Sequence, residues 1–200
     1  MPAPKPRRTK GARRWVPVRA HDCACSSWAT VPVTRLRIAL AGPMGVGKST
    51  VGKALAARLG VGFLDLDAVI GPAGPIFAAE GEAGFRARER AALAELARTH
   101  PGVLALGGGT VVDPWNVAYL RDAGWTIVVL DAPLETLVAR VANDVGTKRP
   151  LAGRLAEVVA ERAESYAAAG VRVDAVGTVD EVVARVLVGT HATRLAGAQG

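Results

Sequence analysis

The chain has 200 residues, half of them hydrophobic, which suffices for one compact domain and leaves little room for a second. Its formal net charge is +7, but residues 1–34 hold seven Lys or Arg against one Asp, so the rest of the chain has a net charge of only +1. A nucleic-acid-binding face needs a basic surplus on the folded domain itself, and no apolar run approaches the roughly 20 residues that cross a bilayer. We therefore expect neither nucleic acid nor membrane as a partner.

Residues 1–34 are rich in Pro and Arg and show no helical or strand period. We expect a disordered basic tail, either solvated or upstream of the true start, rather than a transit peptide or a binding arm. Cys23 and Cys25 lie here beside His21, without the four-ligand spacing of a structural zinc site. Reduced thiols and a cytoplasmic protein are the expectation.

Strands and helices are predicted to alternate from residue 35 onward. Alternating apolar residues over 35–41 predict a buried strand, and Val51, Leu55 and Leu59 before Gly60 predict a helix over 48–59. Further strands are expected at 62–66, 103–106, 126–130 and 171–174, and helices at 81–98, 115–122, 134–142, 154–168 and 179–188. This order implies an α/β fold in which helices cover both faces of a parallel sheet, and residues 191–200 are expected to form a flexible tail.

The segment GPMGVGKST, Gly42 to Thr50, matches the complete P-loop pattern between a predicted strand and a predicted helix. Its glycines allow backbone N–H groups to approach phosphate oxygens, and the helix directs its positive dipole end at the anion. Lys48 can reach the β- and γ-phosphates, and the Ser49 hydroxyl can bind Mg²⁺. The sequence therefore predicts an ATP site formed by Gly45, Val46, Gly47, Lys48, Ser49 and Thr50.

Acidic and basic side chains follow the next strands. The second strand ends in FLDLD, where strand alternation would send Asp65 and Asp67 to the same side, one supporting Mg²⁺ and the other accepting a hydrogen bond from an attacking hydroxyl. On the next helix, Glu82 and Glu89 are spaced to brace Arg86, whose guanidinium could hold a carboxylate. From this spacing alone, a solvated salt-bridge face is the favoured interpretation.

Three glycines, Gly107, Gly108 and Gly109, follow the third strand directly. Such a run lets a substrate lie against bare backbone, which a mechanical turn seldom requires. We expect contact between this glycine loop and a ligand.

Together these motifs resemble the shikimate kinase family: GPMGVGKST, FLDLD, GExxFRxxE at 81–89, LGGG at 106–109, KRPL at 148–151, and ER before Tyr166 occur in the family's order. The resemblance implies a nucleoside-monophosphate-kinase-like fold with a five-stranded parallel sheet within residues 35–190, a substrate region over about 67–98 and a lid over about 143–154. It implies ATP and Mg²⁺ as cofactors and a monomeric enzyme that phosphorylates shikimate.

The resemblance also implies roles for individual residues. Lys48, Asp67 and Arg149 would be catalytic, and Arg149 in the lid would also bind ATP. The acceptor would contact Asp67, Arg86, Gly107, Gly108, Gly109 and Arg162, with both arginines on its carboxylate. Ser49 and Asp65 would serve the metal.

Two segments, 67–85 and 149–162, are shorter than in the family. A kinase of a related cyclitol or hydroxy acid is therefore one alternative, with gluconate-type kinases a weaker one. A non-catalytic nucleotide-binding module is another, although a pure binder has no need for acceptor-side acids.

Overall fold

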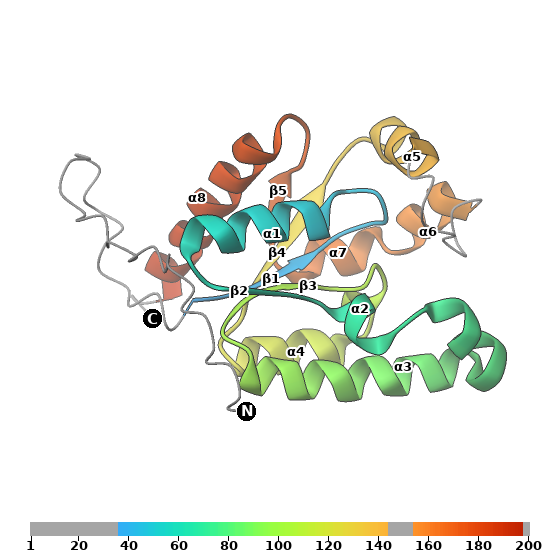
Figure 1. Cartoon of the computed structure of the whole chain (residues 1–200). Helices are drawn as coiled ribbons and strands as arrows, with labels where there is room; N and C mark the ends of the chain where they lie inside the picture. The colour runs from blue at the N-terminus through green and yellow to red at the C-terminus, as the bar shows by residue number, and fades with distance from the viewer. Residues whose placement is uncertain (1–35, 144–153, 198–200) are drawn as a thin grey trace, which may run out of the picture. The chain divides into compact units, whose positions relative to one another are not determined.

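The computed structural model describes residues 36–143 and 154–197, with side chains as far as residue 191. Its centre is a five-stranded sheet in the order β2-β3-β1-β4-β5 with every neighbouring pair parallel, which confirms the predicted fold class (Figure 1). The strands are β1 (Arg37–Ala41), β2 (Gly62–Asp65), β3 (Gly102–Ala105), β4 (Thr126–Asp131) and β5 (Val171–Asp174).

Helices connect the strands and cover both faces of the sheet (Figure 1). They are α1 (Lys48–Leu59), α2 (Leu66–Ile70), α3 (Ala73–Thr99), α4 (Pro114–Asp122), α5 (Leu134–Asn143), α6 (Leu155–Glu161), α7 (Ala163–Ala169) and α8 (Val179–Gly197), with a 3-10 turn η2 (Thr110–Val112). In the described part of the chain no helix is long and apolar enough to span a bilayer.

The central strand β1 shows why the sheet is buried on both sides. Ile38 and Leu40 join a core cluster with α1, α5, α6 and α8, whereas Ala39 and Ala41 join a second cluster with α3, α4 and α7. Successive strand residues point to opposite faces, so a strand covered on both faces is apolar at nearly every position. This explains the continuous run Ile38–Ala41, in which all residues are fully buried.

The segment after β2 differs most from expectation. The sequence predicts a strand over 62–66 and no helix before residue 81, but β2 ends at Asp65, and α2 and the first part of α3 occupy the interval. Gly81, with φ 70° and ψ −174°, interrupts α3 where the predicted helix was to begin. α2 and the first part of α3 are too short to show a recognisable helical period, and Gly71 and Pro72 separate them.

Two other predicted boundaries were wrong. The helix expected over 154–168 is divided at Arg162 into α6 and α7. The last helix was expected to end at 188, but α8 continues to Gly197, so residues 191–197 are helical rather than a flexible tail. Most of the predicted lid, and the predicted tail at 1–34, lie outside the described residues.

Candidate active site

The P-loop joins β1 to α1 in the predicted way. Gly45 and Gly47 have φ values of 80° and 99°, in the left-handed region that favours glycine. Gly47 is the N-cap of α1, and no described side chain caps the first turn, so the backbone N–H groups there can receive an anion. Lys48 Nζ donates to the carbonyls of Gly42 and Pro43 at 2.9 and 3.0 Å, which folds the ammonium group back over the loop.

Helix α5 lies directly against this loop. A methyl group added at Gly45 would come within 2.7 Å of Val141 Cγ2 and 3.0 Å of the Leu137 carbonyl oxygen. Arg140 donates to the carbonyls of Val46 in the loop, at 3.2 Å, and Ala175 after β5, at 3.0 Å. This contact was not predictable from the sequence, because no local spacing relates Arg140 to the loop. Of the other predicted nucleotide residues, Val46 is buried and Thr50 is exposed on the first turn of α1.

Ser49 and Asp65 bring two oxygen ligands together beside the P-loop. Ser49 Oγ donates to Asp65 Oδ2 at 2.5 Å. Among the described residues no group of three His, Cys, Asp or Glu side chains could hold a metal. Mg²⁺ commonly takes one or two protein oxygens and completes its shell with phosphate oxygens and water, so this pair fits Mg²⁺.

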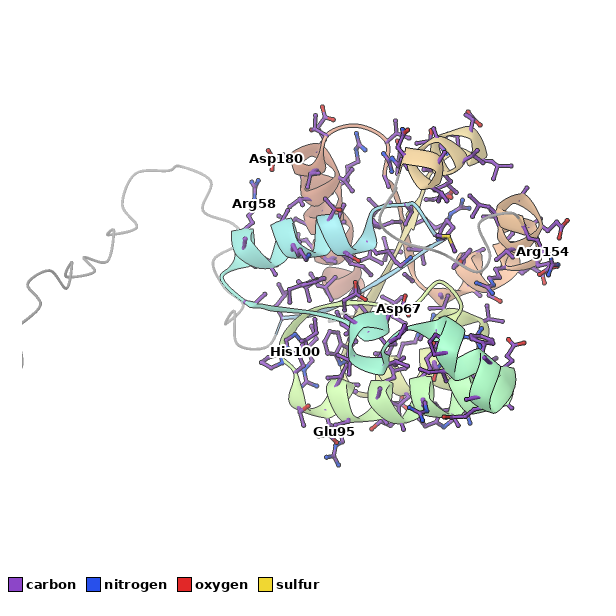
Figure 2. The ribbon with its side chains drawn as sticks, turned by 45° about the vertical axis from the view of Figure 1, so that its right-hand side comes forward. Arg58, Asp67, Glu95, His100, Arg154 and Asp180 are labelled. Atoms are coloured by element: carbon purple, nitrogen blue, oxygen red, sulfur yellow. The ribbon has the colours of Figure 1, made fainter. Side chains whose placement is uncertain are left out.

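Asp65 and Asp67 do not share a strand face, contrary to the prediction. Asp65 ends β2 and caps α2 by accepting a hydrogen bond of 3.1 Å from the Asp67 backbone N–H. Asp67 belongs to the first turn of α2, between α1 and α3 in the view of Figure 2. Its carboxylate approaches the glycine loop, since a methyl group added at Gly107 would lie 2.7 Å from Asp67 Oδ1. The turn of helix therefore points one acid at Ser49 and the other at the glycine loop.

Arg86 lies beside the same loop and is held by a buried acid. Arg86 Nη1 donates to Glu89 Oε2 at 2.7 Å, and the contact with Glu82 is longer, at 3.5 Å. Thr110 Oγ1 donates to the other oxygen of Glu89 at 2.6 Å, and Thr110 is fully buried. The predicted brace is therefore Glu89, and the role of Thr110 was missed. A methyl group added at Gly109 would come within 2.7 Å of Arg86 Nη2.

Arg162 also contacts the glycine loop, at Gly108. Its Nη1 donates to the Gly108 carbonyl at 3.0 Å, and Tyr166 Oη donates to the same oxygen at 2.6 Å. Burial raises the pKa of the Tyr166 hydroxyl above its ordinary value, against a smaller opposing effect of Arg162. A methyl group added at Gly108 would lie 3.9 Å from the Met44 backbone nitrogen, so the glycine loop adjoins the P-loop.

The fold thus brings the two glycine-rich loops together, because β1 and β3 are neighbours and both loops follow their carboxyl ends. Two arginines and Asp67 approach the second loop, and Ser49 with Asp65 lies beside the first. Arg149, predicted to be catalytic and to bind ATP, lies outside the described residues with the rest of KRPL.

The family model for shikimate kinase matches residues 44–189. The chain belongs to the shikimate kinase family. A shikimate kinase from Gloeobacter violaceus is 48% identical over 148 residues, which cover 69% of this chain and 82% of that protein. The family assignment confirms the resemblance stated from the motifs.

Solved structures agree with the fold. A shikimate kinase from Acinetobacter baumannii in complex with shikimate has a TM-score of 0.71 and 32% identity, covering 82% of this chain and 99% of that one. A gluconokinase from Sinorhizobium meliloti has a TM-score of 0.61 and 26% identity over 83% of this chain and 96% of that one. The architecture is thus shared with kinases of other hydroxy acids, whereas the family model matches shikimate kinase.

Proposed function

We propose that this chain transfers the γ-phosphoryl group of ATP to a hydroxyl group of shikimate, with Mg²⁺. Family membership supports the reaction, and members of this family use ATP with Mg²⁺. In this chain the main support is that the P-loop lies next to a glycine loop, which two arginines contact. Phosphoryl transfer needs both: a cradle for the donor phosphates and a grip that holds the acceptor in line.

On the donor side, the N–H groups of residues 45–50 and the ammonium of Lys48 would receive the phosphates. The first turn of α1, whose N-cap Gly47 has no capping side chain, supplies aligned N–H donors, and the lysine is already folded over the loop. When bound, Mg²⁺ would supply positive charge that offsets the charge of the phosphates. Ser49 would hold the ion and Asp65 would orient Ser49, as their contact of 2.5 Å allows.

On the acceptor side, Arg86 and Arg162 would bind the carboxylate of shikimate. They approach the glycine loop at Gly109 and Gly108, respectively, and a guanidinium can pair with a carboxylate through two parallel hydrogen bonds. Asp67, beside Gly107, would accept a hydrogen bond from the attacking hydroxyl. The bare backbone of Gly107–Gly109 would form the floor under the ring.

A coupled ADP-release assay over shikimate, quinate, gluconate and several cyclitols tests this proposal. We expect saturable, stoichiometric ADP release with shikimate and at least 100-fold lower kcat/KM with each other acceptor, because a site built to pair polar groups rejects ligands that leave them unpaired. A higher kcat/KM for gluconate or a cyclitol would reassign the acceptor. ATP binding without turnover of any acceptor would instead favour a nucleotide-binding module.

Two further predictions concern the setting of the enzyme. We propose that it acts as a monomer in the cytoplasm, because the described site is assembled from one chain and both cysteines of the sequence are expected as reduced thiols. Light scattering on the purified chain checks the first point, and cell fractionation checks the second.

A further inference from the structure

The carbonyl oxygen of Gly108 accepts two hydrogen bonds, one from Tyr166 in α7 and one from Arg162, the N-cap residue of α7. Tyr166 Oη lies 2.6 Å from it and Arg162 Nη1 lies 3.0 Å from it. A backbone carbonyl has two lone pairs, so both acceptor positions are used. The middle of the glycine loop is thereby tied to the arginine proposed to bind the acceptor.

Tyr166 is placed to do this rigidly. It is 7% exposed and belongs to the core cluster that α3, α4 and α7 form with the sheet. Its backbone N–H donates to the Arg162 carbonyl at 2.9 Å. Arg162 itself lies at the break between α6 and α7, with φ −100° and ψ 2°. The hydroxyl is therefore a fixed point, whereas the arginine is half-buried at the end of a long, flexible side chain.

We propose that Tyr166 is a positioning residue for the acceptor. The Tyr166 hydroxyl holds the Gly108 carbonyl, and through this carbonyl it positions the guanidinium of Arg162. This inference rests on the proposed function and assigns a role to a residue that does not itself grip the carboxylate.

The physical reason is the conformational entropy that the glycine loop loses when substrate binds. Three consecutive glycines are the most flexible backbone a loop can have, so each group that fixes their peptides lowers the entropy lost when substrate binds. Arg162 has five N–H donors, and its contacts with the Gly108 carbonyl and the Tyr166 hydroxyl leave others for a carboxylate. Without the Tyr166 hydroxyl, the Gly108 carbonyl keeps only its hydrogen bond from Arg162, so the Gly108 peptide and the guanidinium that it orients are held less firmly.

The two tyrosines of the chain provide a matched pair of variants. Tyr119 Oη donates to the Ala94 carbonyl at 3.3 Å, on α4 against α3, so Tyr119→Phe removes a similar hydrogen bond outside the described site. We expect Tyr166→Phe to raise the KM for shikimate about tenfold, the factor that one net hydrogen bond of typical strength can supply. Its kcat and its KM for ATP should stay within about twofold of wild type, and Tyr119→Phe should leave all three unchanged.

A double-mutant cycle with Arg162→Ala tests the route of the effect. Once Arg162 is absent, Tyr166→Phe should raise the KM for shikimate by no more than about twofold further, since coupled residues are non-additive. Full additivity, or equal changes for Tyr166→Phe and Tyr119→Phe, would overturn the inference. The proposed function would be untouched by that result, because it fails only if the wild-type chain does not phosphorylate shikimate.

A second measurement covers the case in which Tyr166→Phe does not fold. In the Tyr119→Phe background Tyr166 is the single tyrosine, so growth on 3,5-difluorotyrosine labels it alone. Fluorination makes the phenol more acidic but keeps its hydrogen bond while it is protonated. A phenolate cannot donate to the Gly108 carbonyl, so we expect the KM for shikimate to rise at alkaline pH. This rise should move to lower pH in the labelled protein, and an unmoved profile would contradict the role of the hydroxyl.

Discussion

Arg86 and Glu89 form an ion pair in which the acid is buried and the base is not: Arg86 Nη1 lies 2.7 Å from Glu89 Oε2, and the two side chains are 31% and 2% exposed. The buried partner is fixed on its other oxygen by Thr110. Arg86 is therefore fixed by a buried acid, while part of its side chain remains exposed to solvent. A surface salt bridge would fix neither partner, whereas this one aims a guanidinium at the glycine loop.

Replacing the buried Glu89 should reduce the stability of the protein. We expect Glu89→Gln to lower the free energy of unfolding by about 2 kcal/mol, as for the loss of a hydrogen bond to a charged group, because the half-buried Arg86 loses its ionised partner. Glu95→Gln is the control on the same helix: Glu95 projects away from the sheet in Figure 2 and its side chain is 64% exposed. Urea denaturation measures both. A similar small change in the two variants would show that Glu89 is not structurally important.

Truncating the arginine should affect the acceptor selectively. We expect Arg86→Ala to weaken shikimate binding by roughly 2–5 kcal/mol, as for the loss of one member of a buried charge pair, and to leave the KM for ATP near wild type. Arg88→Ala, on the exposed side of α3 where Arg88 pairs with Glu80, should change neither constant. Steady-state kinetics decides, and an equal loss with an uncharged carboxamide analogue of shikimate would argue against Arg86 as the carboxylate anchor.

A methyl group on the glycine loop should displace Arg86 without unfolding the protein. Gly109 has φ −110°, which alanine adopts freely, but its added methyl would come within 2.7 Å of Arg86 Nη2. Because a guanidinium at the end of a flexible side chain can move aside, we expect Gly109→Ala to raise the KM for shikimate at least tenfold with little change in Tm. Gly74→Ala, where the added methyl meets no described atom within 4 Å, should be silent in the same assays.

The P-loop lysine should be needed for turnover and not for folding. We expect Lys48→Ala to lower kcat roughly 100- to 1,000-fold, the range for removal of one preorganised charge donor, with a native circular dichroism spectrum. Lys53→Ala, on the exposed face of the same helix, should retain full activity. Unchanged phosphoryl transfer by Lys48→Ala would refute the donor-side geometry.

The raised pKa of Tyr166 predicts an alkaline loss of stability. Burial disfavours the phenolate, so the folded state holds the proton more tightly than the unfolded state. The stability gained is complete below the unfolded pKa of about 10 and is lost as the pH rises through the folded value. Wild type should therefore lose stability between pH 10 and 12 more steeply than Tyr166→Phe, measured by urea denaturation. Parallel curves would contradict the assignment.

Much of the fold was predictable because its signals are local. The P-loop pattern requires a strand before it and a helix after it, and the predicted helix over 48–59 is confirmed to the residue. The three central strands, β1, β3 and β4, are mostly apolar and buried because both faces of the sheet are covered. Once the strands were predicted to be parallel, their carboxyl ends had to share an edge, which brought Asp65, Asp67 and the glycine loop together.

The remaining features depend on contacts between distant segments. The helical spacing of Glu82 and Glu89 about Arg86 is nearly symmetric, and it does not reveal that Glu89 is the buried partner, which accepts a hydrogen bond from Thr110 of η2. Tyr166 was part of a motif, but its hydrogen bond to Gly108 joins residues 58 positions apart. No periodicity encodes such pairs.

The most direct test of the central claim is a ³¹P NMR spectrum of purified chain incubated with Mg-ATP and shikimate. Loss of the γ-phosphate signal should be matched, one for one, by a new phosphomonoester signal and by ADP, and neither should form with Lys48→Ala. Appearance of inorganic phosphate and ADP without the phosphomonoester, or no change in the spectrum of natively folded protein, would contradict the proposed reaction.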